Sequence, residues 1–216
     1  MGYTLGLDTC SNFLAVAVLL DGETVYSLVR RAERRHSREL MPEVARALTA
    51  VGIEAGALEA IGVAAGPGSY TGIRIGMATA EGLARGAAAR LVAVPTFRAW
   101  AIEHGHPGEL VACSLDARGG EVFCALYRRE GQDAIAIHAE DVRPAQEFLA
   151  MVEKQRGVTL FLGEAGKEPA DATGAAGAAR VAASGGETGD PLVFHPFYVR
   201  QASIRSAGGG SHATGK

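Results

Sequence analysis

The sequence predicts an α/β protein made of two units that share one order of elements. In the first unit three strands, a helix, a strand, a helix and a strand follow one another up to residue 94, and a similar order begins again near residue 110. We therefore interpret the chain as an internal duplication, with units at 1–95 and 96–205 and a disordered Gly/Ser-rich tail at 206–216. The length of 216 residues is enough for two cores.

The first unit opens with three antiparallel strands, predicted at residues 3–8, 13–20 and 24–29. Asp21-Gly22 is a strong hairpin turn between the last two. A helix follows, with Ser37 as its predicted N-cap and Gly52 as its end. Its predicted apolar stripe consists of Met41, Val44, Ala45, Leu48 and Val51.

A loop with the sequence GPGSYTG, at 66–72, joins a buried strand to a long helix that ends near Gly86. Glycine costs about 1 kcal/mol relative to alanine inside a helix. The helical glycines therefore indicate close approach on two sides, by the sheet on one and by a second helix or another protein on the other. The two rows of small residues are Gly72, Gly76, Ala80, Ala84 and Ala78, Gly82, Gly86.

Two loops carry residues of the kind that hold phosphate. Gly68, Ser69 and Tyr70 would point backbone amides outward at a helix N-terminus, and Asp8 with Thr9 ends the first strand. No GxxxxGK[ST] is present, GxGxxG is only partial, and the strand at 91–95 lacks the acid that binds a ribose. A tight turn that packs helix on strand explains the loop residues, and we favour it; local backbone hydrogen bonds explain Asp8 equally well.

Five arginines fall within residues 30–38. They could contact the phosphates of a nucleic acid or an acidic partner, with Arg31, Arg34 and Arg35 as candidates, but such runs usually form a solvated surface, which we favour. His36 stands alone there, so we interpret it as a helix-start or packing residue rather than a metal ligand.

Composition indicates an ordinary soluble globular protein. The net charge is −3 and 21% of residues are charged, which excludes a surface that holds nucleic acid everywhere. Cys10, Cys113 and Cys124 are widely separated and form no CxxC, so we expect buried thiols in a reducing cytoplasm. No leader pattern and no apolar run near 18 residues is present, so neither export nor membrane insertion is expected.

The second unit repeats the pattern less regularly. From 163 to 190 the chain is rich in Ala and Gly, with a periodicity that predicts only a poorly specified helix and loops. The earlier elements are a helix at 96–104, strands at 110–116, 121–128 and 134–138, a helix near 144–152 and a strand at 158–162.

Five motifs occur together: LGLDTCS at 5–11, HSRELMPEV at 36–44, GPGSYTGIRIG at 66–76, LDARGGEVFCALY at 115–127 and PFYVR at 196–200. Through them the chain resembles the bacterial TsaB (YeaZ) proteins, which are paralogues of TsaD/Kae1 and were once labelled M22 glycoproteases. The resemblance implies the ASKHA fold of actin, sugar kinases and Hsp70, with two tandem ribonuclease-H-like domains. It also implies a role in forming threonylcarbamoyladenosine at position 37 of tRNAs that read codons beginning with A, as the non-catalytic partner of TsaD, with the ATPase TsaE.

The residues agree with a chain that is not itself an enzyme. TsaD-like catalytic subunits hold a metal with an HxxxH pair, and the corresponding positions here are Thr96 and Trp100. His104 and His106 are two apart, so they face apart on a helix, and neither HxxxH nor HExxH occurs anywhere in the chain. We therefore expect no metal and no peptidase activity.

A nucleotide remains an open alternative, because Asp116 matches the second phosphate loop of the superfamily. No cofactor is expected to be required, although ATP or ADP can act in the complex. The family's usual C-terminal helix is shortened in this sequence, which weakens the case for a complete adenosine pocket. The residues of the predicted vestigial cleft are Asp8, Thr9, Gly66, Gly68, Ser69 and Asp116.

The resemblance also places the TsaD contact on the first two helices, through a face that would close a homodimer in isolation. The alternative is that both helices pack wholly within their own domain. The other functions considered are an ATP-dependent kinase or hydrolase of the same fold and, less favoured, a peptidase. The predicted interface residues are Met41, Leu48, Val51, Gly76, Ala78 and Gly82.

Overall fold

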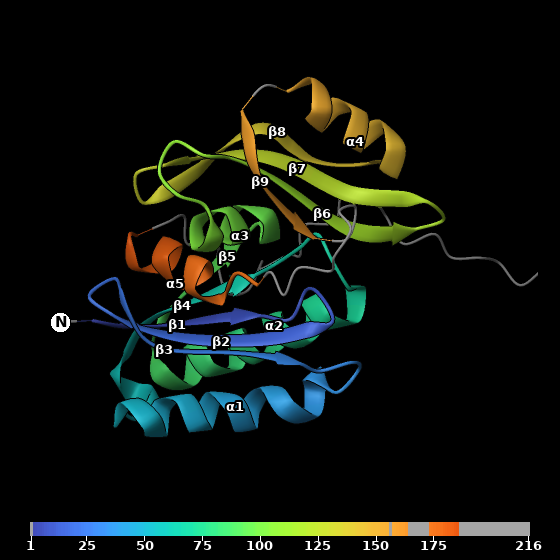
Figure 1. The fold of residues 1–216 in the computed structure, drawn as a ribbon. Helices are drawn as coiled ribbons and strands as arrows, with labels where there is room; N and C mark the ends of the chain where they lie inside the picture. Colours follow the sequence, from blue (N-terminus) through green and yellow to red (C-terminus); the bar gives the residue numbers. More distant parts are fainter. Residues whose placement is uncertain (1, 156, 164–172, 186–216) are drawn as a thin grey trace, which may run out of the picture.

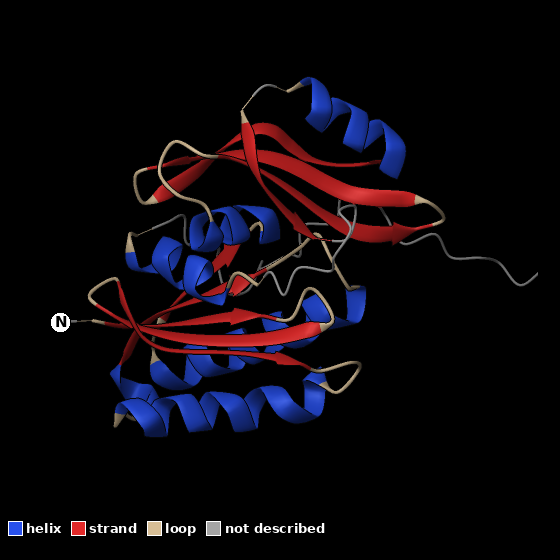
Figure 2. Cartoon of the chain, viewed as in Figure 1, coloured by secondary structure: helices blue, strands red, loops and turns tan. Residues whose placement is uncertain are grey.

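The computed structural model describes residues 2–155, 157–163 and 173–185, and the structural statements below concern these residues. Two sheets form two layers with helices between and outside them (Figures 1 and 2). The motif at 196–200 and the predicted tail at 206–216 lie outside the described residues. None of the described helices is long and apolar enough to cross a membrane.

The predicted elements of the first unit are confirmed. The sheet has the strand order β3-β2-β1-β4-β5, in which β1 is antiparallel to β2 and parallel to β4. Asp21 and Gly22 both have positive φ, at 50° and 86°, as the tight hairpin turn requires. The elements are β1 (Tyr3–Asp8), β2 (Phe13–Leu20), β3 (Glu23–Arg31), α1 (His36–Val51), the short 3-10 helix η1 (Ala55–Ala57), β4 (Leu58–Ala64), α2 (Tyr70–Ala87) and β5 (Arg90–Val94).

The second sheet has the strand order β8-β7-β6-β9, with β6 antiparallel to β7 and parallel to β9. Helix α4 covers its outer face, and α3 lies on its inner face toward the first sheet (Figure 1). The elements are α3 (Thr96–His104), β6 (Leu110–Arg118), β7 (Glu121–Glu130), β8 (Asp133–Pro144), α4 (Ala145–Lys154), β9 (Val158–Gly163) and α5 (Ala175–Ala183).

Helix α1 begins one residue before the predicted cap and buries a different stripe. Arg35 occupies the N-cap position, so the prediction that Ser37 caps the helix was wrong, whereas Gly52 ends it in the left-handed conformation as predicted. Met41 and Ala45 are exposed, because the inner face includes two polar residues that an apolar pattern does not find. The buried residues are His36, Leu40, Glu43, Val44, Ala47 and Leu48.

Helix α5 is buried on nearly every side. It packs on the face of the first sheet opposite α1 and α2, with α3 against it (Figure 1). A helix that is apolar all round shows no 3.6-residue periodicity, so the weak pattern concealed a well-packed element. The expectation of a poorly specified helix was wrong for 175–183, and residues 164–172 and 186–190 lie outside the described residues.

Two glycines allow α5 to approach the sheet. Gly6 of β1 is paired with Gly62 of β4. A Cβ atom at Gly6 would collide with the carbonyl oxygen of Ala175, and one at Gly62 with that of Ala178. The backbone of α5 therefore lies directly on the strands, which accounts for glycine inside two strands where it is normally unfavourable.

Because α5 packs on the first sheet, the chain returns to its first unit after building the second sheet. The domain bounds 1–95 and 96–205 remain a prediction.

Candidate functional site

Asp8, at the end of β1, is a fully buried carboxylate with three N–H donors. Its Oδ1 accepts from the Cys10 amide at 2.8 Å. Its Oδ2 accepts from Trp100 Nε1 at 2.9 Å and from the Gly174 amide at 2.8 Å. Asp8 therefore joins β1 to α3 and to the start of α5.

The loop before α2 packs against the turn that follows β1. The Ser69 amide donates to the Cys10 carbonyl at 2.7 Å, so the predicted outward direction of this amide was wrong. The Thr9 hydroxyl donates to the Gly72 carbonyl at 2.7 Å, and Ser69 Oγ caps the helix by accepting from the Gly72 amide at 3.2 Å. Gly68 has φ 151°, and a Cβ there would collide with the Cys10 carbonyl.

Gly66 connects the same loop to α3. Its amide donates to Thr96 Oγ1 at 3.1 Å, and its carbonyl accepts from the Thr96 amide at 2.7 Å. Both residues are buried. Thr96 thus fastens the start of α3 to this loop, just as Trp100 fastens the next turn of α3 to Asp8.

The structure brings together five of the six residues of the predicted nucleotide cleft, all except Asp116. Asp116 lies on β6, is exposed, and accepts from the Arg118 amide at 2.8 Å. Asp8 is buried with both oxygens engaged, so its carboxylate does not fit the role of a ligand for the metal ion of a nucleotide. The arrangement is that of a packed junction between elements.

His104 ends α3, and its Nε2 lies 2.8 Å from the carbonyl oxygen of Thr173. Burial lowers the pKa of this imidazole, which favours the neutral ring. His106 is exposed beyond the helix. Within 2–155, 157–163 and 173–185 no three His, Cys, Asp or Glu side chains are grouped so that they could hold a metal ion.

The three cysteines are buried free thiols. Burial raises the pKa of Cys10 and Cys113 well above the ordinary value, and that of Cys124 to about 11. A thiol with a raised pKa carries little thiolate at neutral pH, so these residues are poor nucleophiles.

Glu103 is a half-buried acid that the sequence analysis did not single out. Its Oε2 accepts from the amides of Ala176 and Gly177, at 2.9 and 3.2 Å, at the first turn of α5. Burial raises the pKa of this carboxyl group to about 7, against the opposing effect of the two amides. The sequence offered no specific signal for Glu103, because α3 also contains other polar residues and the partners of Glu103 are more than 70 residues away.

The two predicted rows of small residues on α2 differ in their exposure to solvent. Gly72, Gly76, Ala80 and Ala84 are buried, whereas Ala78, Gly82 and Gly86 are exposed. We define the α1–α2 face as the exposed residues Met41, Ala45, Ala78, Gly82 and Gly86 together with the half-buried Val51.

Two predicted interface residues do not reach this face. Leu48 packs in the chain's own core, and Gly76 lies against Thr9, whose hydroxyl a Cβ at Gly76 would strike. Met41, by contrast, is 46% exposed, and nothing lies within 4 Å of where a Cβ at Gly82 would be. Leu48 and Gly76 are therefore removed from the predicted contact surface.

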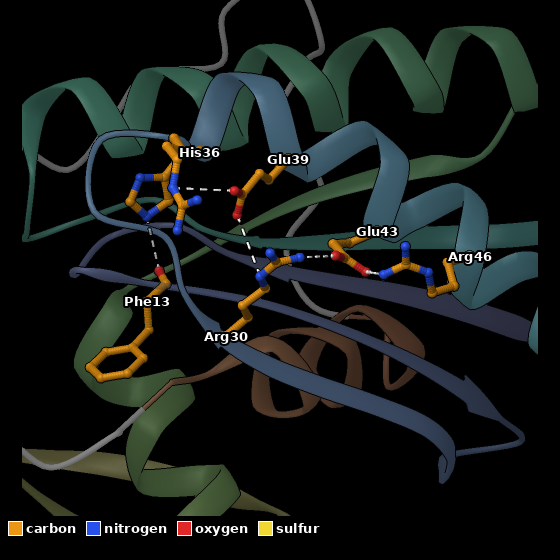
Figure 3. A network of polar contacts seen from close by, with 7 residues as sticks. Phe13, Arg30, His36, Glu39, Glu43 and Arg46 are labelled. Atoms are coloured by element: carbon orange, nitrogen blue, oxygen red, sulfur yellow. Dashed lines mark hydrogen bonds and ion pairs between the residues drawn. The ribbon is translucent and has the colours of Figure 1, made fainter.

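A row of alternating charges joins α1 to β3 (Figure 3). Arg46 Nη1 pairs with Glu43, and Arg30 Nη1 lies 2.8 Å from the same carboxylate. Arg30 also lies 3.6 Å from Glu39, whose other oxygen is 3.3 Å from Arg35. We call these five residues the charge ladder.

Beside this ladder, Arg31 pairs with Glu33 at 2.7 Å, on the surface. His36 is buried, and its Nε2 lies 3.1 Å from the Phe13 carbonyl, which confirms its interpretation as a packing residue at the helix start (Figure 3).

The two sheets, with α3 and α5 between them, define a protein of the ASKHA class, in which the end of β1 is sealed by Asp8, Trp100 and Gly174. A family model described as "TsaD: tRNA N6-adenosine threonylcarbamoyltransferase" matches residues 28–180. The chain therefore belongs to the TsaD family.

Solved structures point to the YeaZ (TsaB) members of that family, as the resemblance predicted. A Pseudomonas aeruginosa protein described as similar to peptidase YEAZ has a TM-score of 0.76 and 26% identity, and the match covers 93% of this chain and 100% of that one. YeaZ from Pseudomonas aeruginosa has a TM-score of 0.76 and 25% identity, with 92% of this chain and 100% of that one covered. No curated protein matches the sequence.

Proposed function

We propose that this chain is the non-catalytic subunit of the complex that forms threonylcarbamoyladenosine at position 37 of tRNAs reading codons that begin with A. In this proposal it binds and supports a TsaD-like catalytic subunit in the cytoplasm, with a TsaE-like ATPase joining them. It requires no cofactor of its own, and ATP or ADP acts at the level of the complex. It binds the catalytic subunit through the α1–α2 face, and in isolation the same face supports a homodimer.

The observation that carries the proposal is the structural role of Thr96 and Trp100. These residues stand where the catalytic relatives carry two histidines, and both side chains are committed to the fold, Thr96 to Gly66 and Trp100 to Asp8. Neither is a metal ligand of the usual kind. Asp8, which a kinase or hydrolase of this fold would need near its nucleotide, is itself closed off. These features favour a supporting subunit over an ATP-dependent kinase or hydrolase.

The α1–α2 face supports the second half of the proposal. It presents small residues on α2 beside an exposed methionine on α1, so the backbones of another helix pair can approach closely. Arg31, Arg34 and Arg35 remain proposed contacts with tRNA or the partner, although Arg31 and Arg35 are also paired with glutamates in this chain.

Reconstitution tests the proposal. Modified tRNA should form only when unmodified tRNA and an activated threonylcarbamoyl donor are mixed with ATP, this chain, the catalytic subunit and the ATPase, as measured by mass spectrometry of nucleosides. The isolated chain should neither hydrolyse ATP nor hold stoichiometric zinc or iron in a metal analysis of untagged protein. Full activity of the mixture without this chain, or ATP turnover by it alone, would reject the proposal.

A bulky residue on the α1–α2 face tests the contact itself. Gly82→Trp should remain folded by circular dichroism yet lose both the homodimer and the catalytic subunit, because overpacking a tight contact costs about 1–3 kcal/mol or more. Ala150→Trp is the matched control, since Ala150 is an exposed small residue on α4 beside the other sheet. Equal binding by both variants would place the contact elsewhere.

A further inference from the structure

Helices α1 and α2 begin side by side at one end of the first sheet, next to the turn that joins β1 to β2 (Figure 1). The Asn12 carbonyl of this turn accepts from the Ala32 amide at 2.9 Å, just before α1. The Cys10 carbonyl, two residues earlier, accepts from the Ser69 amide at 2.7 Å, just before α2. The exposed side chains at the two helix starts therefore belong to one surface.

This end of the molecule is basic, although the whole chain carries a net charge of −3. The segments that build it contain five arginines and two acids. Both acids are engaged within the chain, since Glu33 lies 2.7 Å from Arg31 and Glu39 lies 3.3 Å from Arg35. Both helices also direct the positive ends of their dipoles to this surface. The segments concerned are 9–13, 31–39 and 69–74.

Two of the five arginines, Arg34 and Arg38, have no ion-pair partner among the residues that the structure describes, and both are exposed. Arg34 lies in the turn just before α1, and Arg38 lies in the first turn of that helix. They differ in this from Arg31 and Arg35, whose guanidinium groups are paired with glutamates of the same chain. The charges of Arg34 and Arg38 are therefore available to an anionic partner.

The start of α2 adds an aromatic ring to this surface. Tyr70 is the first residue of the helix and is 47% exposed. The guanidinium carbon of Arg74 lies 4.4 Å from the centroid of its ring, within the range of a cation–π contact. Nucleobases stack on exposed aromatic rings beside arginines, whereas a carboxylate-rich protein surface would need only the charges. We define the basic end as Arg34, Arg38, Tyr70 and Arg74.

The basic end continues the α1–α2 face. Tyr70, Arg74 and Ala78 follow one another at intervals of four residues on α2. On α1, Arg38 precedes Met41 by three residues. Residues at these spacings are neighbours on a helix surface. A nucleic acid held by a subunit that docks on the α1–α2 face would therefore reach the basic end along one continuous surface.

We infer that the basic end binds a single-stranded segment of RNA, with the arginines on its phosphates and a base stacked on Tyr70. The inference rests on the proposed function, in which this RNA is the tRNA substrate. It adds that the chain contacts the tRNA directly and not only through the catalytic subunit. It also moves the contact away from Arg31 and Arg35, which are paired within the chain, to the basic end.

Neutralising the basic end tests the inference in the complex of this chain with the catalytic subunit. The variants are Arg34→Gln with Arg38→Gln, and Tyr70→Ala, with Tyr70→Phe to restore the ring. The matched control is Arg128→Gln with Lys154→Gln, which removes two charges at exposed positions of β7 and α4. The affinity for unmodified tRNA with a terminal fluorophore is measured by anisotropy from about 50 to about 300 mM salt. Sedimentation measures the association of the two subunits.

Each phosphate contact contributes about 0.7–0.9 to the slope of log affinity against log salt, so the double arginine variant should reduce the slope by about 1.4–1.8. Its affinity for tRNA should fall roughly tenfold or more at the lowest salt, whereas the control should change neither quantity. Tyr70→Ala should weaken binding roughly fivefold to a hundredfold, and Tyr70→Phe should bind tRNA as the wild type does.

An unchanged tRNA affinity and salt slope in the arginine variant, or equal binding by Tyr70→Ala and Tyr70→Phe, would overturn the inference. Weaker association of the subunits, with normal tRNA binding by the complexes that form, would assign the basic end to a protein contact instead. In both cases the proposed function stands if the wild-type complex modifies tRNA. If the wild-type chain does not bind the catalytic subunit, the proposed function and the inference fail together.

Discussion

Trp100 Nε1 donates a hydrogen bond to Asp8 Oδ2 at 2.9 Å, across 92 residues of sequence. Both side chains are almost completely buried, and the same oxygen accepts from the Gly174 amide. The Asp8 carboxylate thus links β1, α3 and the start of α5. In this chain the end of β1 is a structural joint.

Removing the indole donor should destabilise the fold. Trp100→Phe leaves a buried carboxyl group with one donor fewer, and we expect the free energy of unfolding to fall by about 1.5–3 kcal/mol, before any cost of lost packing. Asp8→Asn should cost at least as much, because its amide group would face an N–H donor. Urea unfolding of both single variants and the double variant gives the coupling energy, expected between about 0.5 and 3 kcal/mol. A coupling of zero would show that the bond contributes nothing.

Gly62→Ala should weaken the packing of α5. The new methyl group meets the Ala178 carbonyl, and a backbone atom in a buried helix cannot move aside cheaply. We expect a loss of about 1–3 kcal/mol of stability by urea unfolding. Gly56→Ala is the control, because nothing lies within 4 Å of the added atom and φ is not in the left-handed region. Similar midpoints for the two variants would contradict the close approach of α5.

Two glycines of α2 should respond in opposite directions to the same change. Gly76→Ala places a methyl group against Thr9 Oγ1 and should destabilise the chain by about 1–3 kcal/mol. Gly82→Ala adds an atom in open space on a helix, where alanine is favoured over glycine by about 0.5–1 kcal/mol. Thermal unfolding of the isolated protein compares them. Destabilisation by Gly82→Ala would mean that this side of α2 is not open.

Glu103 should make stability depend on pH. Its pKa is raised from 4.5 to about 7 in the folded chain, so between these values the folded state binds more protons than the unfolded state. The stability that this group contributes is fully present below about pH 4.5 and is lost as the pH rises toward 7. Glu103→Gln keeps an oxygen that accepts from Ala176 and Gly177 and removes the titration.

Urea midpoints of wild type, Glu103→Gln and the exposed control Glu147→Gln are compared from about pH 4.5 to about pH 8, a range that contains the expected loss of stability. The decline with pH should be smaller only in Glu103→Gln. A parallel decline in all three proteins would assign the pH dependence to other groups.

The sequence by itself determined the order and type of most elements. Alternating and apolar runs at 3–8 and 13–20 match β1 and β2 residue for residue, and Asp21-Gly22 forms the turn that its residue types require. The five motifs identified the family, because each keeps its place in the chain.

Tertiary structure decided what local pattern cannot express. Helix α5 is buried all round, so it has no polar face to mark it, and Ser37 does not cap α1 although its residue type favours that role. Asp8 and Glu103 take their character from donors more than 70 residues away. Arg30 is paired with Glu43, whereas Arg34 has no ion-pair partner among the residues that the structure describes. This difference depends on which glutamates the fold brings within reach, and that distance is set by packing rather than by sequence spacing.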